Sequence, residues 1–159
     1  MSQDPLARPE PLIRKVYAYV AYRIGAGSEA EDLTSETFER ALRYRGSFDP
    51  QRGTPLAWLF GIARSTLAGR RIRFHEELDA EAEAGPTEIE EQTAERLDLQ
   101  AALARLEERD RELISLRYGA DLSSKQIGEL LGLEPGAVDV SLHRARSRLR
   151  ALLGEAERV

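Results

Sequence analysis

The sequence predicts an all-α protein made of two small helical domains joined by an acidic linker. Apolar residues recur at intervals of three and four along most of the chain, which is the spacing of amphipathic helices. Glycine and proline stand where these runs begin and end, as helix caps and turns require. The chain has 159 residues, of which 42% are apolar, so it has room for one ordinary domain or two small ones.

Charge divides the chain into three parts. Residues 1–74 carry 12 basic and 8 acidic side chains, residues 75–100 carry 1 and 10, and residues 101–159 carry 10 of each. The net charge of −5 argues against a protein that coats nucleic acid through bulk attraction. Because the acidic middle competes for the arginines on either side, we expect the isolated chain to bind DNA poorly.

The acidic middle is expected to be a linker. Residues 75–93 hold few large apolar side chains and include Gly85-Pro86, so they lack the apolar surface that offsets the entropy of ordering. We therefore assign one domain to residues 1–74, the linker to 75–96 and a second domain to 97–159. A solvated acidic helix, interrupted at Gly85-Pro86, is the alternative, because glutamate and alanine are good helix formers.

Two helices are expected at the start of the first domain. Leu12, Val16 and Val20 lie at helical spacing. The segment 25–27 ends this helix, because its glycines readily adopt the left-handed cap conformation. The second helix starts at Ser28, which we expect to be its N-cap, and the acidic residues of its first turn complement the helix dipole.

A loop and a third helix complete the first domain. Residues 45–54 contain glycine, aspartate and proline in turn positions. Thr54 is expected to cap the helix, and Pro55 takes its first position, where the missing backbone donor has no cost. Trp58 and Ile62 lie on its apolar side. This spacing favours a core position for Trp58, with a base-stacking role as the alternative.

The second domain is predicted to contain a helix-turn-helix. Two helices, within residues 101–106 and 107–118, come first. Ser123 and Gln126 then form a capping-box pair that opens a short helix. Gly132 ends this helix, and a proline three residues later starts a longer one. A short helix, a glycine turn and a longer helix in this order are typical of DNA-binding proteins.

The longer helix has an arginine-rich outward side. Its buried stripe is expected at Val138, Leu142, Ala145, Leu149 and Leu152. The side chains on or beside the outward side are Asp139, Val140, His143, Arg144, Arg146, Ser147 and Arg150. Four arginines and no acid lie between residues 142 and 153, and arginine pairs with phosphate or with the acceptor edge of guanine. This side therefore fits DNA, and a merely solubilising role is the alternative.

A second basic stretch lies at the end of the first domain. Its arginines are Arg64, Arg70, Arg71 and Arg73. The aromatic residues that precede or adjoin it are Tyr44, Phe48 and Trp58. No acid lies between residues 51 and 75. Because rings stack on unpaired bases while arginines hold the backbone, the combination suits single-stranded nucleic acid.

Several short motifs occur in order along the chain. They are AEDLTSETF at 30–38, AWL at 57–59, IAR at 62–64, LRY at 116–118, GAV at 136–138 and RAR at 144–146. In this order, around an acidic linker, they resemble the extracytoplasmic-function group of bacterial sigma factors over about residues 10–74 and 97–153. The resemblance implies a transcription initiation factor, not an enzyme, that directs core RNA polymerase to minus-ten and minus-thirty-five promoter elements.

The resemblance also implies roles for particular residues. The side chains implied in docking on the coiled coil of the largest polymerase subunit are Asp32, Leu33, Ser35, Glu36, Phe38, Glu39 and Arg43. Those implied in capturing minus-ten bases of the melted non-template strand are Phe48, Trp58, Arg64, Ser65, Arg70, Arg71 and Arg73. Those implied in contacting the minus-thirty-five element are Asp139, Val140, His143, Arg144 and Arg146.

Four residues, at three places in the chain, depart from the usual motifs of the group. Ser65 stands where asparagine is usual, Gln126-Ile127-Gly128 where Glu-Ile-Ala is usual, and Asp139 where a basic or polar residue is common. A carboxylate at position 139 repels phosphate, but it can accept a hydrogen bond from the amino group of cytosine. We expect these departures to alter promoter specificity more than the fold.

Composition argues against several kinds of site. The chain has no cysteine and only two isolated histidines, His75 and His143, so we expect no metal and no cofactor. No apolar run approaches the roughly 18 residues of a membrane span, and no secretory leader opens the chain. We therefore expect a soluble, cytoplasmic protein without membrane insertion.

The expected partners are core RNA polymerase, promoter DNA and, from the resemblance, an anti-sigma factor. One alternative is a sigma-like decoy that binds an anti-sigma factor without directing transcription. Another is a dimeric helix-turn-helix repressor that binds an operator without polymerase. Transcription with core polymerase distinguishes a sigma factor that directs transcription from both alternatives, because only the sigma factor yields a promoter-specific transcript.

Overall fold

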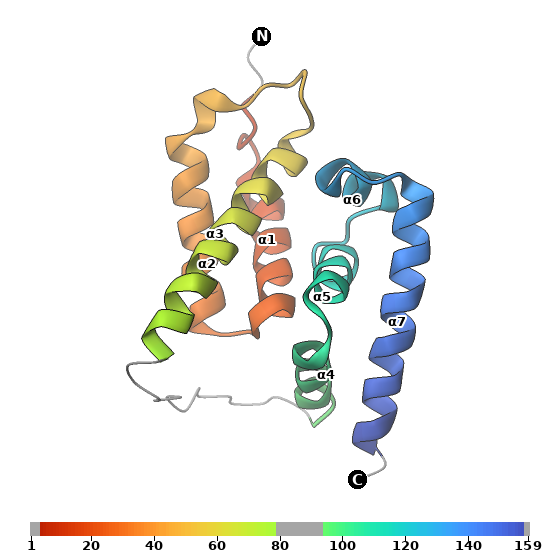
Figure 1. The fold of residues 1–159 in the computed structure, drawn as a ribbon. Helices are drawn as coiled ribbons and strands as arrows, with labels where there is room; N and C mark the ends of the chain where they lie inside the picture. The colour runs from red at the N-terminus through yellow and green to blue at the C-terminus, as the bar shows by residue number, and fades with distance from the viewer. Residues whose placement is uncertain (1–3, 79–93, 158–159) are drawn as a thin grey trace.

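In the computed structural model, which describes residues 4–78 and 94–157, the regular secondary structure is helical (Figure 1). The first half contains α1 (Pro9–Ile24), α2 (Ser28–Arg43), the 3-10 turn η1 (Arg45–Ser47) and α3 (Pro55–Leu78). The second half contains α4 (Ala94–Arg105), α5 (Glu108–Ile114), the π turn η2 (Ser115–Gly119), α6 (Ser124–Leu131) and α7 (Pro135–Glu157). The all-α class is therefore confirmed. Within the two described ranges, no helix is both long and apolar enough to cross a membrane.

Most of the predicted linker, residues 75–96, lies outside the described residues, which stop at 78 and resume at 94. α3 continues to Leu78 and α4 begins at Ala94. Helix therefore extends into both ends of the segment that the sequence assigned to the linker.

Helices α1, α2 and α3 pack around a shared core. Its fully buried large side chains are Val16, Tyr19, Val20, Leu33, Leu59 and Phe60. The rings of Tyr19 and Phe60 meet edge to face with their centroids 5.4 Å apart. In the half that carries the polymerase and minus-ten candidates, α2 packs against both α1 and α3.

The start of α3 is as predicted, whereas the start of α2 is not. The amide of Ala57 donates to the hydroxyl oxygen of Thr54 at 3.1 Å, and Pro55 is the first helical residue. In α2 the N-cap is Gly27, so the expected Ser28 cap is wrong. Gly27 has a φ of 141°, a conformation that residues with side chains rarely adopt, and the helix starts directly after it.

Helices α6 and α7 form the predicted helix-turn-helix. The amide of Gln126 donates to the Ser123 hydroxyl at 3.1 Å, and the amide of Ser123 donates back to the Gln126 side-chain oxygen at 2.9 Å. This reciprocal pair is the predicted capping box. Gly132 ends α6 in the left-handed conformation, with a φ of 71°.

The helix expected over residues 107–118 begins as an α-helix and ends as a π turn. It runs as α5 to Ile114 and continues as the π turn η2. The amide of Ala120 donates to the carbonyl of Ser115 at 3.0 Å, which is the five-residue spacing of a π turn. A Cβ added to Gly119 would lie 2.9 Å from the carbonyl oxygen of Ala18 in α1. The widened turn therefore ends where the second half meets the first.

The two halves pack directly against each other. α1 lies beside α5 and η2, and α3 contacts α6 (Figure 1). Buried apolar residues from both halves belong to one continuous cluster. The sequence predicted two modules joined by a linker, and the prediction did not include this contact between them.

Candidate nucleic-acid interface

Helix α7 presents the outward side that the sequence predicted. Val138 and Ala145 are fully buried and Leu142 is 4% exposed, whereas Val140 is 51% exposed. His143 and Arg144 are exposed as well. The periodicity of the sequence therefore identified which side of α7 is open to a ligand, and an exposed valine beside cations is suited to contact with bases.

The arginines of α7 differ in their surroundings. Arg148 donates to Asp110 of α5 at 2.7 Å, and this hydrogen bond and the charge of Asp110 raise the pKa of Arg148. Arg146 donates to the hydroxyl of Tyr118 at 3.0 Å. Among the described residues, Arg144 forms no ion pair. Arg148 thus holds α7 to α5, while Arg144 is available to a ligand.

The side chain of Asp139 in α7 forms a hydrogen bond with a residue of the preceding helix, α6. Its carboxylate accepts a hydrogen bond from the hydroxyl of Ser124, the first residue of α6. Ser124 follows the capping box at the start of α6, and Asp139 lies near the start of α7, so the hydrogen bond joins the two helices of the helix-turn-helix. The acid that departs from the usual motif therefore has a defined orientation. Sequence reasoning did not single out Ser124.

The aromatic candidates of the first half form a pair. Phe48, in the loop after η1, and Trp58, in α3, meet at 5.7 Å between ring centroids and at 63° between ring planes. Trp58 is half-buried and packs against the core. Its position agrees with the predicted core role and leaves part of the ring pair accessible. Ser65 is exposed on the same helix.

Some arginines of α3 that were expected to bind DNA are already paired with carboxylates of the protein. Arg70 lies 3.8 Å from a carboxylate oxygen of Glu36 in α2. Arg64 donates through its Nε to Glu112 of α5 at 2.8 Å, which is a contact between the two halves. The side chains of Arg71 and Arg73 lie outside what the structure describes. Of these candidates, Arg64 is the one whose environment differs most from the sequence-based expectation.

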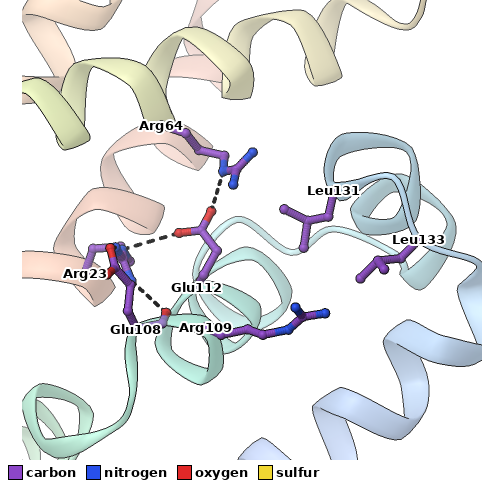
Figure 2. A pocket seen from close by; sticks show the side chains of 7 residues that line it. All are labelled: Arg23, Arg64, Glu108, Arg109, Glu112, Leu131 and Leu133. Atoms are coloured by element: carbon purple, nitrogen blue, oxygen red, sulfur yellow. Dashed lines mark hydrogen bonds and ion pairs between the residues drawn. The ribbon is translucent and has the colours of Figure 1, made fainter.

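Glu112 contacts three side chains from the first half, of which Figure 2 shows Arg23 and Arg64. The hydroxyl of Tyr19 donates to its carboxylate at 2.7 Å, and Arg64 binds the same carboxylate. The Nε of Arg23 lies 3.4 Å from it, and a second nitrogen of Arg23 lies 3.3 Å from Glu108. Burial, followed by the charge and hydrogen bond of Glu112, raises the pKa of Tyr19, so the hydroxyl remains a donor.

Beside this cluster lies an open cavity of about 530 Å³. Its lining side chains are Arg23, Arg64, Glu108, Arg109, Glu112, Leu131 and Leu133. Figure 2 shows Arg64 entering from α3 and the two leucines from the end of α6 and the following turn. In the described ranges, no group of histidine, cysteine, aspartate and glutamate could hold a metal ion.

The polymerase-docking candidates on α2 fall into two groups. Asp32, Ser35, Glu39 and Arg43 are exposed. Glu36 and Phe38 are half-buried, and Glu36 lies 3.2 Å from Arg40. Leu33 is only 1% exposed, so it belongs to the core rather than to the expected docking surface.

Sequence reasoning missed the residues that join the halves, Glu112 above all. One available signal was Arg23, a charged residue on the apolar stripe of α1 whose side chain is 5% exposed. A charge at a buried stripe position needs a partner, because an unpaired buried charge is strongly destabilising. That signal indicates that a partner exists, but it does not identify the partner.

Comparisons with known protein families identify both halves of the chain. Residues 10–73 match the family described as sigma-70 region 2, and residues 96–149 match sigma-70, region 4. The candidate minus-ten arginines up to Arg73 lie in the first match, and the helix-turn-helix as far as residue 149 of α7 lies in the second.

Curated relatives cover most of the chain. It is 37% identical to the ECF RNA polymerase sigma factor BldN of Streptomyces coelicolor in an alignment 152 residues long that covers 90% of this chain and 58% of BldN. It is 34% identical to the RNA polymerase sigma factor CarQ of Myxococcus xanthus over 98% of this chain and 90% of CarQ. It is 30% identical to the ECF sigma factor SigW of Bacillus subtilis, over 87% and 83% of the two chains. The chain therefore spans little more than half of BldN but most of CarQ and SigW.

Two solved structures share the fold. The sigma factor RpoE, in complex with the anti-sigma factor NepR from Bartonella quintana, superposes with a TM-score of 0.68 over 90% of this chain and 92% of its own, at 23% identity. CnrH, in complex with the cytosolic domain of CnrY, gives a TM-score of 0.65 over 94% and 85%, at 26% identity. The two region matches and the relatives BldN, CarQ and SigW show that the chain belongs to the extracytoplasmic-function RNA polymerase sigma factors of the sigma-70 family, a non-enzymatic group that directs RNA polymerase to promoters.

Proposed function

We propose that this chain binds core RNA polymerase and directs it to promoters whose minus-ten element is read by residues 1–74 and whose minus-thirty-five element is read by residues 97–159. The observation that carries the proposal is the exposed, basic side of α7 within a capped helix-turn-helix. This is the arrangement that inserts a recognition helix into the major groove. The protein would act in the cytoplasm, where its polymerase and DNA partners work.

The minus-thirty-five contact is assigned to the outward side of α7. Its members are Asp139, Val140, His143, Arg144 and Arg146. Arg144 has no ion pair among the described residues and is suited to phosphate or guanine, while the exposed Val140 is suited to a thymine methyl group. Asp139, oriented by Ser124, can accept a hydrogen bond from a cytosine amino group. A cytosine preference at one position of the element follows from this assignment.

The minus-ten contact is assigned to the loop after η1 and to α3. Its members are Phe48, Trp58, Arg64, Ser65, Arg70, Arg71 and Arg73. The pair of Phe48 and Trp58 supplies aromatic surface next to an exposed serine. Because unpaired bases stack on rings while arginines hold phosphates, this side is suited to a melted strand rather than to a duplex.

The polymerase contact is assigned to the exposed side of α2. Its members are Asp32, Ser35, Glu36, Phe38, Glu39 and Arg43, without the buried Leu33. The side mixes both signs of charge around a half-buried ring, which is suited to a polar interface with a helical partner.

The proposal also includes an anti-sigma partner and a role for the acidic stretch between the two domains. The neighbours RpoE and CnrH were solved with an anti-sigma factor and with the cytosolic domain of CnrY, which supports an anti-sigma partner for this chain. The acidic stretch 75–96 would join the two DNA-reading domains and pass through the cleft of the polymerase. A strongly acidic segment is suited to a cleft built for polyanions.

Transcription with core polymerase tests the proposal. Holoenzyme is assembled with genomic DNA, the co-purified DNA is sequenced, and the recovered promoter is used as the template. A transcript from one start site is expected, and it should depend on this chain. Absence of any specific transcript, with the chain still captured by an anti-sigma factor, would contradict the proposal in favour of a decoy.

A matched pair of variants tests the role of α7. Arg144→Ala should reduce the transcript about 5- to 150-fold, because one base or phosphate contact is worth about 1–3 kcal/mol. Arg14→Ala removes an exposed arginine of α1 and should leave the transcript unchanged. Equal loss in both variants would contradict a specific contact by Arg144.

A further inference from the structure

The open cavity between the two halves is large enough for a small molecule. Its volume of about 530 Å³ falls within the range of about 300–1,000 Å³ that is typical of ligand sites. Its lining side chains come from α1, α3, α5, α6 and the turn after α6, so neither half forms the cavity alone. Because most of these side chains lie on helices, regular backbone holds the walls in place. The cavity therefore has the size and the rigid walls of a site for a small ligand.

Both carboxylates of the cavity wall are already paired within the protein. Glu112 accepts hydrogen bonds from Tyr19 at 2.7 Å and from Arg64 at 2.8 Å. Glu108 lies 3.3 Å from the buried Arg23. A carboxylate that is paired with an arginine has its charge largely compensated, so it attracts a further cation only weakly. These two acids therefore do not make the cavity a site for a cation.

Two arginines of the wall keep donors for a ligand. Arg64 binds Glu112 through its Nε, and its two terminal nitrogens have no partner among the residues that the structure describes. Arg109 is exposed and forms no hydrogen bond or ion pair within the same described ranges. Since three arginines and two glutamates line the cavity, its wall has one surplus positive charge. Unpaired guanidinium donors in such a wall favour an anion, and above all one with a planar or forked acidic group.

The remaining side of the cavity is apolar. Leu131 and Leu133 are half-buried, and Figure 2 shows Arg64 and Arg109 extending toward them from α3 and α5. The two leucines flank Gly132, whose left-handed φ of 71° ends α6 and sets the course of the turn. A ligand with an apolar group would cover the leucine surface that is still open to water, and such burial favours binding in proportion to the apolar area removed from water.

We propose that this cavity binds a small organic anion, whose acidic head is held by Arg64 and Arg109 and whose apolar part covers Leu131 and Leu133. The ligand class is a carboxylate or sulfonate with one negative charge and an aliphatic chain or aromatic ring. One negative charge matches the surplus positive charge of the wall, whereas the acids of the wall disfavour a polyanion. The site needs neither polymerase nor DNA, so its existence does not depend on the proposed promoter function.

Binding to the full-length chain is measured with anilinonaphthalene sulfonate, an aromatic dye with one negative charge whose fluorescence rises in apolar surroundings. The expected dissociation constant is about 10–100 µM, which is the usual affinity for a ligand of about 20 non-hydrogen atoms. A dye concentration tenfold above that constant should raise the melting temperature by about 3–6 °C, because the ligand binds only the folded chain. Absence of binding at about 1 mM dye would refute the site.

Competition against the dye tests the two parts of the ligand separately. Octanoate supplies a carboxylate with an aliphatic chain, and naphthoate supplies a carboxylate with an aromatic ring. At least one of them should displace the dye, and the stronger competitor identifies whether the apolar part is a chain or a ring. Octylammonium has the same chain with the opposite charge, and acetate has the same head without the chain, so neither should compete. Displacement by octylammonium would exclude an anion site, and equal displacement by acetate would exclude the apolar contact.

A pair of arginine variants locates the acidic head. Arg109→Gln removes the exposed guanidinium of the wall and should weaken dye binding about tenfold, because a hydrogen bond to a charged group is lost. Arg14→Gln removes an exposed arginine of α1 that does not line the cavity, so the affinity should stay the same. Both variants change the net charge equally, and circular dichroism checks that each keeps its helix content. Equal affinities in the two variants would overturn the assignment.

A pair of leucine variants locates the apolar part. Leu133→Ala shortens a side chain of the wall and should weaken dye binding about threefold or more. Leu130→Ala shortens a half-buried leucine of α6 that does not line the cavity, so it should leave the affinity unchanged. If either leucine variant fails to fold, the arginine pair decides, because Arg109 has no partner among the described residues whose loss would destabilise the chain. Equal weakening by both leucine variants would contradict an apolar contact at Leu133.

Discussion

Replacing Gly128 by alanine, the residue usual in this motif, should destabilise the protein. Gly128 is buried in α6, and a Cβ added there would lie 2.4 Å from the carbonyl oxygen of Leu133. The contact arises because the turn folds back over α6. The amide of Leu133 donates to the carbonyl of Gly128 at 2.9 Å, and the amide of Gly132 donates to the same oxygen. The methyl group would have to displace backbone atoms that these hydrogen bonds hold.

Two opposing terms set the magnitude. Alanine in place of glycine stabilises a helix interior by about 1 kcal/mol. Overpacking in a tight site costs about 1–3 kcal/mol, and weakening the turn hydrogen bonds costs about 1 kcal/mol more. The net loss is therefore about 1–3 kcal/mol. For a protein of this size that loss lowers the melting temperature by about 2–12 °C.

Thermal unfolding followed by circular dichroism checks this prediction, with Gly136→Ala as the matched control. Gly136 is in α7, and a Cβ added there meets nothing within 4 Å. The control should melt at or above the temperature of the parent, because only the helix term applies. If Gly128→Ala also melts at the temperature of the parent, the close approach of Leu133 to Gly128 does not determine the stability of the variant.

Three further substitutions test other contacts. Ser123→Ala removes the capping hydroxyl of α6 and should lower the free energy of unfolding by about 1 kcal/mol in a denaturant titration; an unchanged midpoint would exclude a stabilising cap. Asp110→Asn weakens the partner of Arg148 at a side chain that is 9% exposed, and it should lower the melting temperature more than Arg105→Ala, which breaks an exposed pair. Tyr19→Phe keeps the ring but removes the hydrogen bond to Glu112, so the variant should be less stable than the parent. Because the raised pKa of Tyr19 makes the folded parent lose stability above about pH 10, the stability gap between parent and variant should narrow in melts above that pH. A gap that widens there would contradict this linkage.

Local patterns explain why much of the fold could be predicted. The stripe of α7 depends only on helical periodicity, and Val138, Leu142 and Ala145 are indeed buried. The caps at Thr54 and Ser123 depend on residues within three positions of each other. Such features require no knowledge of what packs against the helix. The docking role of Leu33 came instead from the family resemblance, which marks α2 as a whole, whereas burial separates the two sides of the helix.

Contacts between distant residues could not be predicted in the same way. Tyr19 and Glu112 are 93 positions apart, and Arg64 and Glu112 are 48 apart. Glu112 lies in a stretch of acids and arginines, and the sequence of this stretch does not distinguish a partially buried acid from a solvated one. The π turn is equally hidden, because its residues have ordinary helix propensities. Only the tertiary structure brings Gly119 and Glu112 onto α1.

The character of the interface decides whether the two halves can be separated by a partner. The apolar part of the interface is of domain-core type, because buried apolar residues of both halves form one continuous cluster. This packing of η2 on α1 is joined to a cluster of charges around Glu112. Charged groups that separate can find other partners in water, whereas buried apolar contacts are lost when they are exposed. A partner that separates the halves therefore has to replace mainly the packing at Gly119 and the contacts of the buried Arg23.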